Sequence, residues 1–83
     1  MHILIVDEDL DILKAFRECF LLFDYKVDIF QSPVQALKIV QQTDYDAVIT
    51  EIKLPEMSGL IFIENTLKIK NNINEILSEL PFY

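Results

Sequence analysis

The sequence predicts an α/β fold whose core is a doubly wound parallel sheet. Two short apolar runs, residues 3–6 and 46–50, have the β-branched composition of strands buried on both faces. Segments with apolar residues at three- and four-residue steps, typical of amphipathic helices, alternate with the strands. Such alternation implies parallel pairing through right-handed crossovers, so the expected element order is β-α-β-α-β-α. For a doubly wound sheet of this kind we take the strand order to be 2-1-3.

The first half of the chain contains two predicted strands and a helix. The run 3–6 ends in three acids, and the period then changes to that of a helix of about four turns, with apolar residues from Leu10 to Phe23. Asp9 is the expected N-cap of this helix. Residues 25–30 alternate between apolar and polar, which predicts an edge strand with one face in solvent.

The second half begins with a clear helix start. Ser32 and Pro33 have the order of an N-cap followed by a first helical residue, and this helix extends to about Val40. The strand 46–50 follows, then a loop over 51–59 that holds the lone glycine, Gly59. A single glycine implies either few tight turns or a position where no other residue fits. A third helix is expected from Leu60 onward.

The C-terminal stretch has a heptad-like pattern. Its apolar positions are spaced by four and three residues: Phe62, Thr66, Ile69, Ile73, Ile76 and Leu80. Two alternatives are open, a helix (or two short helices broken at Asn71-Asn72) lying on the sheet, or a helix–helix contact in a dimer. In both, residues 71–83 form a C-terminal helical tail.

Composition limits the class of protein. The chain has 83 residues, enough for one small domain spanning 1–83, and its hydrophobic fraction of 52% is too high for a disordered chain. Its net charge of −7 argues against direct binding to nucleic acid or to an anionic membrane. One cysteine, no membrane-length apolar run and no signal-peptide pattern indicate a cytoplasmic protein.

Three acids occupy the predicted carboxyl ends of neighbouring strands. Asp7 and Glu8 follow the first strand, and Glu51 follows the strand 46–50. Ligands of doubly wound sheets bind at this end, and converging carboxylates suit a hard cation such as Mg²⁺. The alternative, that these acids only cap helix N-termini, is also open.

Two segments, residues 3–9 and 47–59, together resemble the receiver domain of two-component response regulators. In the first segment, a strand is followed by an acidic pair. In the second, a strand is followed by an acceptor position, a proline and a glycine at the spacings of the family. The similarity covers about residues 2–70. The resemblance implies an incomplete flavodoxin-like sheet. It also implies metal binding by Asp7, Glu8 and Glu51 with the backbone carbonyl of Lys53, a phospho-acceptor position at Glu51, and a loop shaped by Pro55 and Gly59.

The sequence departs from the family pattern at the acceptor. The family has aspartate there, whereas Glu51 places its carboxylate one methylene further out, and a displacement of about 1 Å can cost on the order of a hundredfold in rate. The longer side chain also reaches toward the position of a phosphoryl oxygen, so that it could mimic the phosphorylated state.

The second departure is length. The family has five strands, and this chain is expected to end after the third β-α unit, without the family's switch hydroxyl and lysine. The strand containing Val48 would then be an open edge, which proteins seldom leave unprotected. A second copy, the chain's own residues 73–83 or another protein would cover it; we favour a homodimer formed through this edge or through Ile69, Ile73, Ile76 and Leu80.

Three functions follow from these features. The favoured one is a non-phosphorylatable receiver-like module, a pseudo-receiver, that regulates by binding a protein partner or itself and is not an enzyme. The second is an inactive fragment of a larger response regulator. The third is a switch that accepts phosphate with weakly bound Mg²⁺.

Overall fold

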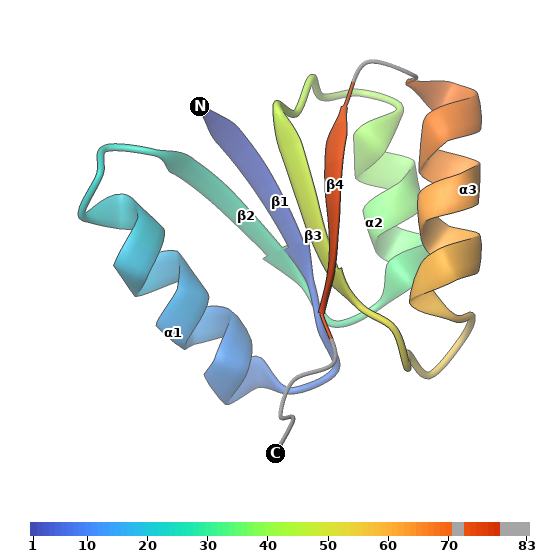
Figure 1. Cartoon of the computed structure of the whole chain (residues 1–83), viewed down its shortest axis with the longest axis horizontal. Coiled ribbons are helices and arrows are strands. Elements are labelled where there is room, and N and C mark those ends of the chain that lie inside the picture. The colour runs from blue at the N-terminus through green and yellow to red at the C-terminus, as the bar shows by residue number, and fades with distance from the viewer. Residues whose placement is uncertain (71–72, 79–83) are drawn as a thin grey trace.

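Four strands and three helices alternate along the chain in the computed structural model, which describes residues 1–70 and 73–78 (Figure 1). The elements are β1 (His2–Val6), α1 (Leu10–Leu21), β2 (Lys26–Phe30), α2 (Pro33–Val40), β3 (Ala47–Glu51), α3 (Gly59–Ile69) and β4 (Asn74–Ser78).

The strands form one parallel sheet in the order β2-β1-β3-β4. The predicted order 2-1-3 is therefore confirmed for the first three strands. β1 lies in the middle, where Ile5 pairs with Ile29 of β2 on one side and with Ile49 of β3 on the other. The apolar composition of β1 and β3 follows from this position, because both strands are covered on two faces.

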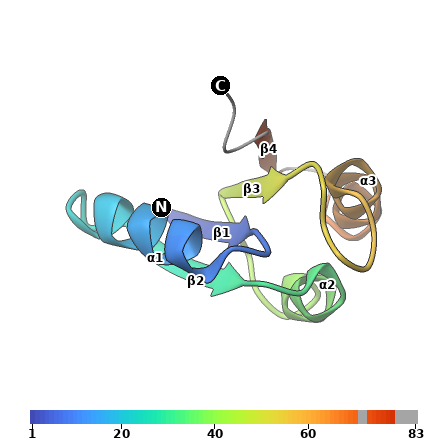
Figure 2. The same cartoon turned by 90° about the horizontal axis from the view of Figure 1, so that it is seen from below.

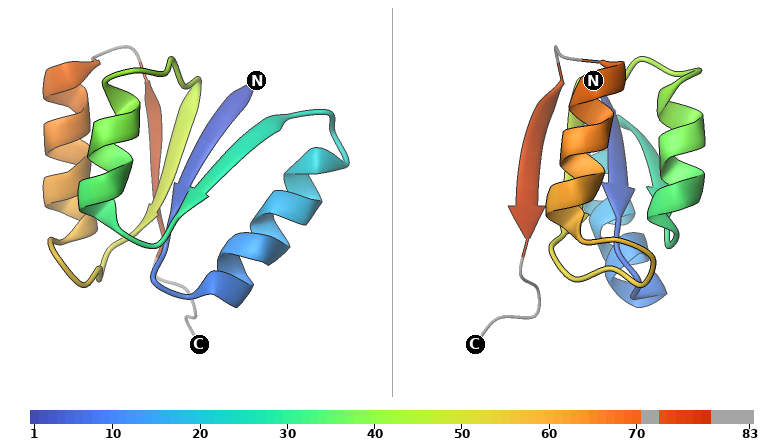
Figure 3. Two further views of the ribbon diagram at one scale, coloured as in Figure 1. Left: turned by 180° about the vertical axis from the view of Figure 1, so that it is seen from behind. Right: turned by 90° about the vertical axis from the view of Figure 1, so that its right-hand side faces the viewer.

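The helices lie on opposite faces of the sheet, with α1 on one side and α2 and α3 side by side on the other (Figures 2 and 3). Side chains along each strand point alternately to the two faces, so the core consists of two clusters, one on each face of the sheet. Leu4 and Val48 pack toward α2 and α3, and Ile3 and Ile5 pack toward α1. Figure 2 shows α1 over the β1–β2 half of its face.

Each helix begins at a side chain that caps its first turn. Asp9 Oδ1 accepts from the backbone N–H of Asp11, Ser32 Oγ from that of Gln35, and Ser58 Oγ from that of Ile61. The predicted caps Asp9 and Ser32 are confirmed, and such a cap typically stabilises a helix by about 1 kcal/mol. Nowhere in residues 1–70 and 73–78 is a helix long and apolar enough to span a membrane.

The amino ends of the strands are joined by a polar network. The Tyr45 hydroxyl donates to Asp28 Oδ2 over 2.6 Å, and His2 Nε2 lies 2.8 Å from the same oxygen. The backbone N–H of His2 donates to Asp46 Oδ2 over 2.7 Å, and the N–H of Asp46 donates to the His2 carbonyl. These contacts fix the start of β1 to β2 and to the segment that enters β3.

The predicted C-terminal helical tail is wrong, because β4 occupies Asn74–Ser78. The helix ends at Ile69, and Lys70 already has an extended backbone. Asparagine is a poor helix former, which favours this end before Asn71-Asn72. Phe62 and Thr66 of the expected heptad pattern are fully buried inside the domain. They are not available for a helix–helix dimer; Leu80 lies outside the described residues.

The strand containing Val48 is not an open edge. β4 pairs with β3 from Ala47 to Glu51, so the expectation that the sheet stops at the third unit is also wrong. Val48 is completely buried, and Ile73 joins the core beneath α2 and α3. Ile76 pairs with Ile49 in the sheet, and Ile69 lies at the exposed end of α3. The edge strands among the described residues are β2 and β4.

Candidate functional site at the carboxyl ends of the strands

The carboxyl ends of β1 and β3 bring two acidic side chains together. Val6 and Thr50 are paired in the sheet, so Asp7 and Glu51 follow at adjacent positions. The two carboxyl groups lie close enough for Asp7 to raise the pKa of Glu51. The sequence predicted this convergence from strand order alone.

Asp7 is held in place by the backbone around it. Asp7 is only 3% exposed, and its Oδ1 accepts a hydrogen bond from the N–H of Asp9 over 2.9 Å. Its own N–H donates to the carbonyl of Phe30, at the end of β2, over 3.1 Å. The turn from β1 into α1 therefore fixes this carboxyl group at the rim of the sheet.

Glu51 has an unusual environment for a carboxyl group. Burial, the side-chain hydrogen bond with Asp7 and the negative charges of Asp7 and Glu8 raise its pKa to about 7, against a smaller opposing effect of a hydrogen bond with the Glu8 backbone. Its Oε2 is buried and has no hydrogen-bond partner in the part of the chain that the structure describes. A buried unpaired oxygen is costly, and a protein tolerates few of them.

The donor set at this site fits a hard divalent cation. The carboxyl oxygens of Asp7 and Glu51 are the type of ligand that Mg²⁺ prefers, and the unpaired Oε2 is available as a ligand. Glu8 is exposed, and within residues 1–70 and 73–78 no three His, Cys, Asp or Glu side chains are arranged to hold a metal. The expected three-carboxylate cluster is thus present only as a pair.

The loop after β3 explains the single glycine. A β-carbon at Gly59 would lie 2.1 Å from the carbonyl oxygen of Glu51 and 3.0 Å from Ile52 Cα, so only glycine fits. The N–H of Gly59 donates to the Ile52 carbonyl over 2.6 Å. Its backbone has no positive φ, so close approach and not turn geometry requires the glycine. Lys53 and Pro55 are exposed on the same loop.

One contact of this loop was not foreseen from the sequence. The Ser32 hydroxyl, which caps α2, donates to Glu56 Oε1 and so connects the loop to α2. The two residues are 24 positions apart, and no local pattern pairs them. Only the packing of α2 against α3 on one face of the sheet (Figure 2), which brings together the loops that precede these helices, could have suggested it.

The chain matches the family model described as the response regulator receiver domain over residues 3–77. It belongs to this family. The receiver match extends through most of β4, in agreement with the four-stranded sheet. Receiver domains are regulatory modules.

Individual receiver proteins are similar to this chain in sequence and in structure. Response regulator MprA of Mycobacterium sp. (strain KMS) is 30% identical over 60 residues, 72% of this chain and 26% of MprA. The crystal structure of response regulator TrrA from Thermotoga maritima in complex with Mg²⁺-BeF has a TM-score of 0.86 and 32% identity, covering 92% of this chain and 66% of that one.

A second structure containing TrrA shows a complex. In the crystal structure of histidine kinase ThkA with TrrA, the matched chain has a TM-score of 0.86 and 29% identity, covering 99% of this chain and 74% of that one. This chain thus spans about a quarter of the length of MprA and about two-thirds to three-quarters of the matched structures.

Proposed function

We propose that this receiver domain is a non-phosphorylatable regulatory module, a pseudo-receiver of two-component-type signalling, that acts by protein–protein association and not as an enzyme. The observation that carries the proposal is the state of Glu51 at the acceptor position. Its carboxyl group is one methylene longer than that of the family's aspartate and is partly turned into the protein, with one oxygen buried.

Electrostatics at Glu51 support the same conclusion. With its pKa raised to about 7, roughly half of the carboxyl groups carry a proton at neutral pH. A protonated carboxyl is not a nucleophile. Protonation therefore removes about half of the reactive carboxylates at neutral pH. Geometry is the larger obstacle to attack on a phosphoryl group, because a misplacement of about 1 Å can cost on the order of a hundredfold in rate.

A Mg²⁺-dependent phospho-accepting switch is the second candidate function. It is favoured by the closely placed carboxyl groups of Asp7 and Glu51 and by the unpaired Oε2 of Glu51. We propose that Mg²⁺, where it binds, does so weakly at Asp7, Glu8 and Glu51, with the backbone carbonyl of Lys53. Bound metal would supply positive charge at this rim, and the pair would hold and orient it.

The partner that we propose is a protein, either a second copy of the chain in a homodimer or a signalling protein. The complex of ThkA with TrrA provides a precedent for a histidine kinase as partner of a receiver domain. The net charge of −7 argues against direct contact with nucleic acid or an anionic membrane, and we propose a cytoplasmic setting.

Phosphorylation by a small donor tests this proposal. The chain is incubated with acetyl phosphate and Mg²⁺, and its intact mass is measured, with TrrA treated in parallel as the positive control. We expect a phosphate adduct on TrrA and none on this chain. A stable adduct that disappears in the Glu51→Gln variant would contradict the proposal and favour the second candidate.

A further inference from the structure

We propose that the loop between β2 and α2 is a brace that couples the two acid-bearing loops at the rim of the sheet. The brace consists of Gln31 and Ser32, and the two loops are the β1–α1 turn, residues 7–9, and the β3–α3 loop, residues 52–58. This inference deepens the proposed function, because it names a means of regulating the same rim. It rests on that function only in that a partner reads the rim.

The first arm of the brace reaches the turn between β1 and α1. The Gln31 side chain donates from Nε2 to the carbonyl of Glu8 over 3.0 Å. The carbonyl of the preceding residue, Phe30, accepts from the N–H of Asp7 over 3.1 Å. The turn that holds Asp7 is therefore hydrogen-bonded to two consecutive residues of the chain between β2 and α2.

The second arm reaches the loop between β3 and α3. The Ser32 hydroxyl donates to Glu56 Oε1 and accepts from the N–H of Gln35, so the same oxygen serves the brace and the cap of α2. A hydrogen bond to a charged carboxylate is stronger than one between neutral groups. The loop that follows Glu51 is therefore tied to the start of α2.

The architecture places the brace between the two loops. β1 is next to β2 in the sheet, so the end of β2 lies beside the β1–α1 turn. α2 packs against α3 on one face of the sheet, so the start of α2 lies beside the loop that enters α3 (Figure 2). Gln31 and Ser32 connect these two regions.

The brace is stiff between its two arms. Gln31 and Ser32 are adjacent in the chain, and Ser32 has an extended backbone with φ of −102° and ψ of 120°. Pro33 follows, buried, with its φ fixed by its ring. A movement of one arm is therefore passed to the other, and a change at the exposed residue Glu56 should alter the rim without any contact with Asp7.

Amide hydrogen exchange of the whole chain, followed by NMR, tests the brace. The reporters are the backbone N–H groups of Asp9 and Gly59, each hydrogen-bonded within one of the two loops. Glu56→Ala cuts the second arm, yet we expect exchange at Asp9, beside the first arm, to rise by roughly three- to tenfold, the range for loss of one hydrogen bond. Gln31→Ala should likewise raise exchange at Gly59.

Three further variants separate the brace from the cap of α2. Ser32→Thr keeps both the cap and the donor and should leave both reporters unchanged. Ser32→Asp keeps a good N-cap but has no proton to donate and repels Glu56, so it should raise exchange at both reporters. Glu56→Gln retains an acceptor oxygen and should restore most of the wild-type protection that Glu56→Ala loses.

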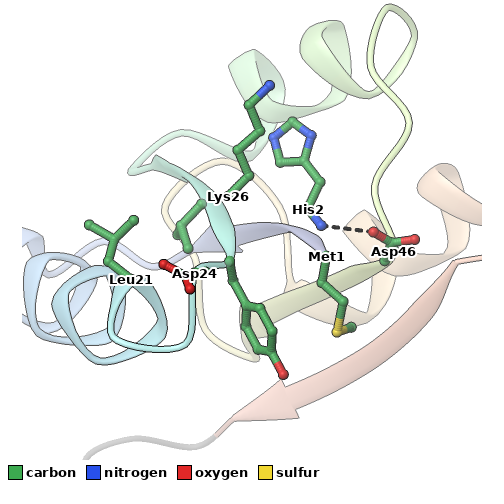
Figure 4. A pocket seen from close by; sticks show the side chains of 8 residues that line it. Met1, His2, Leu21, Asp24, Lys26 and Asp46 are labelled. Atoms are coloured by element: carbon green, nitrogen blue, oxygen red, sulfur yellow. Dashed lines mark hydrogen bonds between the residues drawn. The ribbon is translucent and has the colours of Figure 1, made fainter.

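The matched control cuts a bond to another carboxylate at the amino ends of the strands, away from the rim. There the N–H of His2 donates to Asp46 Oδ2 over 2.7 Å (Figure 4). Asp46→Ala should leave exchange at Asp9 and Gly59 at the wild-type rates. An equal rise in this control would mean that the reporters follow general destabilisation, and the brace would be refuted.

Two other results would overturn the inference. One is a change confined to the loop whose own bond is cut, which would show two independent contacts. The other is equal exchange in Ser32→Asp and Ser32→Thr, which would show that Ser32 only caps α2. The mass measurement with acetyl phosphate is independent of these results, so a phosphate adduct would contradict the proposed function and leave the brace standing.

Discussion

Gly59 and the carbonyl of Glu51 are in such close contact that the site and the start of α3 cannot move independently. A β-carbon on Gly59 would lie 2.1 Å from that carbonyl oxygen. Two elements therefore hold the backbone of Glu51 in place. One is the sheet, through β3, and the other is Gly59, the first residue of α3. The geometry of the Glu51 backbone is tied to the position of α3.

Gly59→Ala should destabilise the protein by at least about 2 kcal/mol, because the clash is with backbone atoms that have no other rotamer. Chemical denaturation measures this change. Ser58→Ala is the matched control at the neighbouring position, where loss of the Oγ cap should cost only about 1 kcal/mol. Equal costs for the two variants would show that α3 shifts easily to make room.

Glu51 should make the protein less stable as the pH rises. Its folded pKa is raised from 4.5 to about 7, so its favourable contribution is complete below about pH 4.5 and is lost as the pH passes through about 7. The loss should be on the order of 2 kcal/mol, after allowance for screening by solvent.

Denaturant titrations at several pH values compare the wild type with Glu51→Gln. The variant should lack most of the decline between pH 4.5 and 7. An unchanged slope in the variant would mean that other groups account for the pH dependence. Added Mg²⁺ should reduce the decline in the wild type if the carboxyl pair holds the ion.

Ile73→Ala should cost about 3 kcal/mol in unfolding free energy, because Ile73 is 6% exposed and packs beneath α2 and α3. Ile69→Ala, at a position 36% exposed on α3, should cost less than about 1 kcal/mol. Thermal or denaturant melts distinguish the two. Similar small costs for both variants would contradict the burial of Ile73 in the core.

Tyr45 should ionise only at strongly alkaline pH. Burial and the hydrogen bond to Asp28 raise its pKa well above the ordinary value of 10. Its contribution to stability is complete below that value and is lost above it. An absorbance titration of phenolate should contain one late step that is missing in Tyr45→Phe. The variant should also lose about 1 kcal/mol of stability at neutral pH, because Asp28 loses a donor.

The sequence predicts best what local chemistry decides. The starts of α1 and α2 are decided by residues within the first turn of each helix, Asp9 and Ser32-Pro33, and both caps are observed. The meeting of Asp7 and Glu51 was also predictable, because topology alone brings the ends of β1 and β3 together. The burial of one Glu51 oxygen was not, since it depends on how the neighbouring loops pack.

The residues after α3 show where such reasoning fails. Ile73 and Ile76 have a spacing that a helix and a short strand share. Residues 74–78 form a strand because they pair with the free edge of β3. A local sequence pattern does not show that a strand more than 20 residues earlier is available for pairing. The α1–β2 turn is similar. Phe23 continues the apolar spacing of a helix, yet α1 ends at Leu21 and leaves Phe23 exposed.

The central place of β1 affects how the protein is made on the ribosome. Synthesis proceeds from the amino end, so β1, α1 and β2 can associate before residues 47–51 emerge. Until then the other side of β1, which later pairs with β3, has no partner. During synthesis β1, the most deeply buried strand of the folded domain, is therefore paired on one side only until β3 emerges. Slow translation between β2 and β3 would prolong its exposure to chaperones and to neighbouring nascent chains.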